Sequence, residues 1–207
     1  MNSLIDILIF LPAILIAITF HEYAHGRVAY ALGDDTPRLQ GRLTVNPLPH
    51  IDWIGFAMLL IFHFGWAKPV QVNPYNFKQI SLKQGMMLVS LAGPGMNLLL
   101  ALAGMIAMRL LTPFHGSEWG GIALQLFHPL VTINIILAAF NLIPLPPLDG
   151  SKILAGLLPD SGASMMYSLE QYGTVILLLL IVTGIASKIF LPIAGFLYNF
   201  LYTLVFF

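Results

Sequence analysis

One short segment of the chain has residue types and a spacing that suit metal chemistry, and it reads His21-Glu22-x-x-His25. On an α-helix, residues four apart lie one turn apart on the same face, so His21 and His25 can bind the same metal ion. Glu22 lies about 100° around the helix from His21, where its carboxylate can reach a water molecule on that metal. Two histidine ligands followed by a glutamate base are typical of zinc hydrolases.

The position of this motif in the chain strengthens the metal interpretation. A lone histidine on an apolar helix is usually a packed or hydrogen-bonded side chain. Here two histidines and a glutamate follow directly on the apolar run Leu4–Phe20. Ionisable side chains inside a membrane segment each cost about 2.5–3.5 kcal/mol on insertion scales, so they usually mark a functional site. We therefore interpret His21, Glu22 and His25 as part of a metal site inside a membrane.

The composition predicts an integral membrane protein. Of the 207 residues, 58% are hydrophobic and only 9% are charged, whereas soluble domains carry about 25% charged residues. The net charge of zero gives no indication of nucleic-acid binding. The chain contains no cysteine, so a metal must be held by histidine and carboxylate. No basic region precedes the first apolar run, so we expect that run to remain as a helix rather than act as a cleaved signal peptide.

Hydrophobic runs predict an all-α, polytopic helical bundle in a single domain, residues 1–207. The expected spans are residues 4–32, 86–111, 122–143 and 174–206. The last run is too long for one upright span, and Lys188 and Pro192 divide it, so one kinked helix and two shorter helices both remain open. Residues Ile54–Trp66 are apolar but too few to cross, which predicts a re-entrant or interfacial segment. Residues Leu39–Val45 alternate weakly and suit a short strand or hairpin arm.

A proline-rich segment follows the third predicted span and leads to a carboxylate. Pro144, Pro146 and Pro147 cannot continue a regular helix, so the backbone there should be extended, with groups free to pair with a substrate strand. Asp149 comes directly after this break. An ordinary helix terminus would explain it, but the chain offers few carboxylates within predicted spans. We therefore expect Asp149 to be the third metal ligand.

The second predicted span contains Gly93-Pro94-Gly95-Met96-Asn97. Glycine permits close approach of helices, and proline frees a backbone carbonyl, so this segment could be a packing kink. Asn97 inside a membrane nevertheless needs a polar partner. A packing kink and a contact with the active site both remain open for this segment.

The distribution of basic residues predicts the orientation. If Ile54–Trp66 does not cross, seven basic residues fall on one side: Arg27, Arg38, Arg42, Lys68, Lys78, Lys83 and Lys152. The positive-inside rule makes that side cytoplasmic. His21 and Asp149 then lie at the same depth, at the cytoplasmic ends of their spans. A crossing of Ile54–Trp66 would place them at opposite faces.

Two of these motifs together resemble the site-2 protease family of intramembrane zinc metalloproteases. The first is His21-Glu22-x-x-His25, and the second is Asn141-x-x-Pro144-x-x-x-Leu148-Asp149-Gly150. Three further segments look like the compact bacterial branch without a PDZ domain: Arg42–Pro47, Gly65–Val70 and Gly93–Asn97.

The resemblance implies a three-helix catalytic core with broken helices at the active site. It implies one zinc ion per chain, held by His21, His25 and Asp149, with Glu22 as the catalytic base and Asn141 stabilising the oxyanion or positioning substrate. It also implies cleavage of transmembrane proteins or peptides within the lipid bilayer. The expected location is the cell membrane, the inner membrane in bacteria, with the site opening to the cytoplasm.

Three other functions fit the sequence less well. A di-iron lipid hydroxylase needs clustered histidines, but the remaining ones are scattered: His50, His63, His115 and His128. A metal-binding or transport protein needs a polar path across the membrane, and the other predicted spans are nearly free of carboxylates. An inactive protease homologue is disfavoured by the presence of Glu22.

Overall fold

The computed structural model describes residues 4–62, 65–114 and 116–207, and this part of the chain is helical without any β-strand. The helices are α1 (Leu4–Ala31), α2 (Thr36–Leu39), α3 (Trp53–Phe62), α4 (Leu82–Leu111), α5 (Glu118–Asn141), α6 (Asp149–Leu157), α7 (Asp160–Val182) and α8 (Ile185–Phe206). Five of them, α1, α4, α5, α7 and α8, are long and apolar enough to cross a membrane. The prediction of an all-α, polytopic membrane protein is confirmed.

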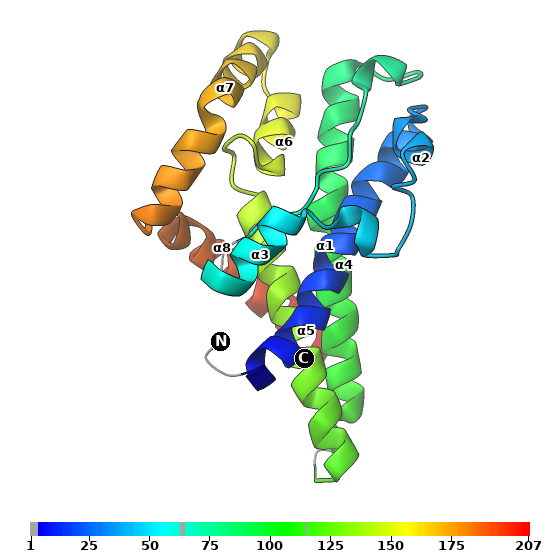
Figure 1. Cartoon of the computed structure of the whole chain (residues 1–207), viewed down its shortest axis with the longest axis vertical. Coiled ribbons are helices and arrows are strands. Elements are labelled where there is room, and N and C mark those ends of the chain that lie inside the picture. The colour runs from blue at the N-terminus through cyan, green and yellow to red at the C-terminus, as the bar shows by residue number, and fades with distance from the viewer. Residues whose placement is uncertain (1–3, 63–64, 115) are drawn as a thin grey trace.

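Helices α1, α4 and α5 pack against one another and form the centre of the molecule (Figure 1). Small side chains are buried where these helices meet, including Ala17, Ala101 and Ala138. Small residues let helix backbones approach closely, which is how helices associate without a hydrophobic driving force in lipid. This trio positions the metal motif, because α1, which carries it, packs on both α4 and α5.

Serine caps fix where α4 and α5 begin. The side chain of Ser81 accepts a hydrogen bond from Gln84 N, and the side chain of Ser117 accepts one from Gly120 N. Each serine satisfies a backbone donor that the first helical turn leaves unpaired. At its other end α4 packs on α8, where Arg109 Nη1 donates to the carbonyl of Val205.

The C-terminal apolar run forms two helices. The break lies at Gly184, whose φ of 72° is in the left-handed region that ends many helices. The expectation that Lys188 and Pro192 divide this run is wrong, because both lie inside α8. Transmembrane helices tolerate an interior proline when neighbouring groups satisfy the freed carbonyl.

The expected strand at residues 39–45 is also wrong. Gly41 has a φ of 67°, and Arg42 N donates to Pro37 O, so the backbone turns back towards α2. The β-like pairing occurs further along, as an antiparallel bridge between Ile51 and Ala67. This bridge brings residues 65–70 close to α1.

Asp34 ties the end of α1 to a later loop. Its buried carboxylate accepts hydrogen bonds from Thr36 N and Oγ1, from Asn73 N and from Asn76 Nδ2. Burial alone would raise the pKa of Asp34, but these hydrogen bonds outweigh it and hold the pKa below its ordinary value. The loop that follows residue 65 is thereby held against the helix that carries the metal motif.

Candidate metal centre

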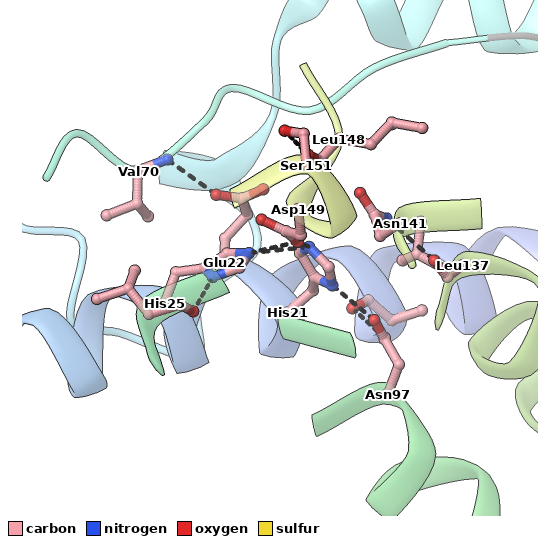
Figure 2. A network of polar contacts seen from close by, with 12 residues as sticks. His21, Glu22, His25, Val70, Asn97, Leu137, Asn141, Leu148, Asp149 and Ser151 are labelled. Carbon is pink, nitrogen blue, oxygen red and sulfur yellow. Dashed lines mark hydrogen bonds and ion pairs between the residues drawn. The ribbon is translucent and has the colours of Figure 1, made fainter. Parts of the chain in front are cut away.

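His21 and His25 of α1 meet Asp149, the first residue of α6 (Figure 2). The two Nε2 atoms are 3.0 Å apart. Asp149 Oδ2 lies 3.3 Å from Nε2 of His21 and 3.2 Å from Nε2 of His25. The structure therefore brings together the three side chains that the sequence analysis selected as ligands.

The outer hydrogen bonds of the two imidazoles determine which ring nitrogens face each other. His21 Nδ1 lies 2.6 Å from Asn97 Oδ1, and His25 Nδ1 lies 2.7 Å from Val89 O. Both partners are acceptors, so each Nδ1 must carry the proton. Each Nε2 then presents an unprotonated lone pair towards Asp149.

The donor set fits a zinc ion. Asp149 Oδ2 is buried and accepts no hydrogen bond from the described residues, and it faces two nitrogen lone pairs. Such an arrangement is repulsive unless a cation lies at its centre. Ligand atoms about 2.0–2.2 Å from a tetrahedral zinc ion are roughly 3.3–3.5 Å apart, close to the separations of His21, His25 and Asp149.

Helix α4 packs directly against the two histidines at Gly93. A Cβ atom added at Gly93 would lie 2.4 Å from His25 Nε2 and 2.6 Å from His21 Cε1. Only glycine lets the backbone of α4 come this close. Together with the hydrogen bond of Asn97 to His21, this settles the open choice for the Gly93–Asn97 segment in favour of contact with the site.

Asn134 of α5 is a supporting residue that the sequence analysis missed. Asn97 Nδ2 donates to Asn134 Oδ1 at 2.8 Å and to Ala17 O at 3.1 Å, so the amide of Asn97 is held with its oxygen towards His21. Asn134 is fully buried. An amide inside the third predicted span was the available signal, because a polar side chain in a membrane needs a partner.

Glu22 points from α1 towards the extended segment after residue 66 (Figure 2). Its Oε2 accepts a hydrogen bond from Val70 N at 2.8 Å, and only 9% of the residue is exposed. One carboxylate oxygen is thus held by the backbone beside the three ligand atoms. Sequence reasoning did not identify Val70, because a backbone donor leaves no signature in residue type.

Asn141 is the last residue of α5, close to the turn that leads to Asp149 (Figure 2). Its Nδ2 donates to Leu137 O, one turn back in the same helix, at 3.0 Å. Within the described residues it makes no hydrogen bond to His21, Glu22 or Asp149. The structure therefore brings Asn141 near the site but gives it a local partner.

An apolar cavity of about 220 Å³ lies between α1, α3 and α5, and its lining includes Thr19 of α1, two residues before His21. Side chains from all three helices line it, among them Ile14, Ile18, Leu59, Ile133 and Leu137. Residues 47–52 and 65–67 close one side of it. It offers an apolar surface next to the end of α5.

The other histidines form no second metal site in the described part of the chain, where His21, His25 and Asp149 are the one group with suitable ligand atoms. His50 is buried and donates to Thr44 O, whereas His63 and His115 lie outside the described residues.

Comparison with known proteins identifies the family. Residues 104–184, which include Asn141 and Asp149, match the model of peptidase family M50. The protein YwhC of Bacillus subtilis, provisionally named a zinc metalloprotease, is 40% identical over 182 residues, which cover 86% of this chain and 82% of YwhC. The chain belongs to peptidase family M50. It is a zinc metalloendopeptidase of the site-2 protease family, as the motifs predicted.

More distant relatives carry the same kind of name as YwhC. Rip2 of Mycobacterium tuberculosis is 30% identical over 191 residues, covering 89% of this chain and 71% of Rip2. MJ0611 of Methanocaldococcus jannaschii is 32% identical over 152 residues, covering 73% of this chain and 72% of MJ0611. Both are provisionally named zinc metalloproteases. No solved structure matches the chain. Family membership and the apolar helices identify this M50 peptidase as a multi-pass membrane protein with zinc as its cofactor.

Proposed function

We propose that this M50 peptidase hydrolyses peptide bonds of transmembrane proteins or peptides within the bilayer. The observation that supports this proposal most strongly is the position of the ligand cluster. His21 and His25 lie in α1, a helix long and apolar enough to cross a membrane, and they are buried against α4 and α6. A protease with its metal at this depth acts on peptide bonds that are themselves in the membrane.

His21, His25 and Asp149 are the residues that would hold one zinc ion. Zinc, when bound, lowers the pKa of a coordinated water towards ~7 and polarises a carbonyl. Asn97 and the carbonyl of Val89 keep the two imidazoles in the ligating tautomer.

Glu22 is the general base in this proposal. Val70 N holds its Oε2, which leaves Oε1 to accept the proton of the attacking water. The same carboxyl group then delivers that proton to the leaving amine. The carboxylate of Glu22 is held by a hydrogen bond from Val70 N, and it is not one of the three proposed metal ligands.

The substrate needs an extended backbone at the site, because a helix hides its carbonyls in its own hydrogen bonds. The Pro144–Pro147 segment, directly before Asp149, forms turns instead of the extended backbone expected from the sequence, and Leu145 O already accepts a hydrogen bond from Leu148 N. The apolar cavity between α1 and α5 suits a substrate side chain. We assign to Asn141 a donor that stabilises the oxyanion, because its amide nitrogen carries a second N–H besides the one that it donates to Leu137 O.

The enzyme is proposed to lie in the cell membrane, the inner membrane in bacteria, with its site open to the cytoplasm. The basic residues support this orientation, since Arg38 lies in α2, Arg42 follows α2, and Lys83 lies in the first turn of α4. Helix α2 and the end of α1 lie at the same end of the molecule as the start of α4 (Figure 1).

Cleavage in lipid vesicles tests the proposal. The purified enzyme is reconstituted with a model substrate of one apolar span and soluble flanks, and the fragments are identified by mass spectrometry. We expect a cut inside the apolar span, and none in parallel vesicles that contain Glu22→Gln. A cut confined to the soluble flanks, or equal cleavage by the variant, would contradict the proposal.

A further inference from the structure

Arg42 is a buried charged residue that the proposed chemistry does not use. Only 4% of it is exposed, and none of the ion pairs in the described part of the chain includes it. Its guanidinium instead donates to two successive backbone carbonyls, from Nη2 to Lys68 O at 2.5 Å and from Nη1 to Pro69 O at 3.2 Å. A buried charge is costly unless its surroundings compensate it, so this placement indicates a role for the guanidinium.

The peptide unit between Pro69 and Val70 is held from both sides. Its oxygen accepts from Arg42, and its N–H donates to Glu22 Oε2 at 2.8 Å. A peptide unit is planar, so an anchor on its oxygen fixes the direction of its N–H. The cation lies at the negative end of the peptide dipole and the carboxylate at its positive end, so the two hydrogen bonds reinforce each other.

His50 completes the anchor of Arg42. Nε2 of His50 donates to Thr44 O at 2.9 Å, which leaves Nδ1 to accept from Arg42 Nη2 at 3.3 Å. Burial lowers the pKa of His50, and the nearby charge of Arg42 lowers it as well, which favours the neutral ring that can accept. The backbone carbonyl of His50 in turn accepts from Lys68 N at 3.0 Å.

Gly26 permits this arrangement on α1, one turn after Glu22. A Cβ atom added at Gly26 would lie 3.0 Å from Leu43 Cδ2 and 3.6 Å from Val70 Cγ1. The segments that carry Arg42 and Val70 therefore both lie directly on the helix that carries the base.

We propose that Arg42 is a positioning residue for the hydrolytic reaction. It clamps the Pro69–Val70 peptide, whose N–H holds one oxygen of Glu22, so that the other oxygen is aimed at the attacking water. The inference rests on the proposed role of Glu22 as the base. Two carbonyls at a fixed separation suit the planar fork of arginine, which the single ammonium of lysine cannot reproduce.

Steady-state kinetics of Arg42→Gln test this proposal. We expect kcat to fall about tenfold to a hundredfold, because small misplacements of a reacting group cost rates of this order. KM should stay within about twofold, and zinc content and melting temperature should stay close to wild type. Arg42→Lys should restore part of kcat. Arg38→Gln is the matched control, since Arg38 pairs with the exposed Asp35, and it should keep the wild-type kcat.

A double-mutant cycle separates positioning from a structural role. Glu22→Asp shortens the base by one methylene, so Val70 N–H can no longer hold it as it holds glutamate. If Arg42 acts through Glu22, adding Arg42→Gln to Glu22→Asp should cost little more, whereas a structural role gives independent losses that multiply. Multiplying losses, an unchanged kcat in Arg42→Gln, or a loss of kcat that follows loss of zinc would each overturn the proposal.

Two further outcomes keep the test decisive. If Arg42→Gln does not fold, Arg42→Lys carries the same measurement, and a wild-type kcat there would overturn the positioning role. Full turnover by Glu22→Gln would overturn the proposed function itself. An inactive Glu22→Gln beside a fully active Arg42→Gln would overturn only the role of Arg42.

Discussion

Asp149 supplies the third proposed zinc ligand, and it lies in a different part of the chain from the two histidines. Its Oδ2 is buried, faces both Nε2 atoms and has no hydrogen-bond donor in the described structure. Asp149→Ala should therefore lower zinc affinity by more than the 10- to 100-fold that loss of a ligand's hydrogen-bond partner costs. Competition with a zinc-binding dye measures the affinity. Wild-type zinc affinity in Asp149→Ala would show that the third ligand is another group.

Substitution of Asn141, at the end of α5, tests whether its amide is the proposed donor to the oxyanion. Its amide now donates to Leu137 O, so the catalytic and structural roles predict different results for Asn141→Ala. As a donor to the oxyanion its loss should lower turnover roughly a hundred- to a thousandfold, with zinc content and melting temperature nearly unchanged. If the amide of Asn141 serves only to hold the end of α5 through Leu137 O, its loss should lower the melting temperature instead. A destabilised variant with a normal rate per folded molecule would reject the catalytic role.

At the scale of elements, the close approach of α4 to α1 gives a prediction with a matched control. Gly93→Ala puts a methyl group 2.4 Å from His25 Nε2, so one helix must shift and the ligand geometry with it. Gly95→Ala makes the same chemical change at a position where, among the described residues, no atom other than the local backbone of α4 and the two neighbouring residues lies within 4 Å. We expect zinc affinity to fall about 10- to 100-fold in Gly93→Ala and to stay unchanged in Gly95→Ala. Equal affinities in the two variants would contradict the close packing.

The same elements show which parts of the site a sequence can predict. His21 and His25 were predictable because the spacing of a helix is local, and Asp149 was predictable because few other carboxylates lie in apolar surroundings. The hydrogen bonds of Asn134 and Val70 were not predictable, because they exist only once α1, α4, α5 and the segment after residue 66 have packed.

Two predicted boundaries failed for local reasons. Gly184 ends α7 through a left-handed φ, whereas Pro192 is accommodated inside α8. Gly41, with its positive φ, turns residues that alternate weakly in hydrophobicity away from a strand. In both places the backbone freedom of one glycine outweighed the pattern of its neighbours.

At the scale of the whole molecule, the orientation rests on α3 remaining on one side of the membrane. Helix α3 has 10 residues, which at about 1.5 Å per residue span roughly half of a 30 Å hydrocarbon core. The chain has no native cysteine, so single cysteines can map its topology. Gln40→Cys and Tyr75→Cys, on either side of α3, should label from the same face in sealed vesicles.

Trp119→Cys provides the control for the opposite face. Trp119 is 81% exposed at the start of α5, beyond the end of α4. It should label from the face opposite to Gln40→Cys if α4 crosses. Labelling of Gln40→Cys and Tyr75→Cys from opposite faces would contradict the orientation and the proposed cytoplasmic opening of the site.

The central claim is that Glu22 performs base catalysis beside a zinc ion that it does not hold. The most direct test measures zinc content and turnover on the same preparations of wild type and Glu22→Gln. We predict one zinc per chain in both, with turnover lowered about 10²–10⁴-fold in the variant, the usual contribution of a general base. Turnover that survives the substitution, or zinc that is lost together with turnover, would contradict the account.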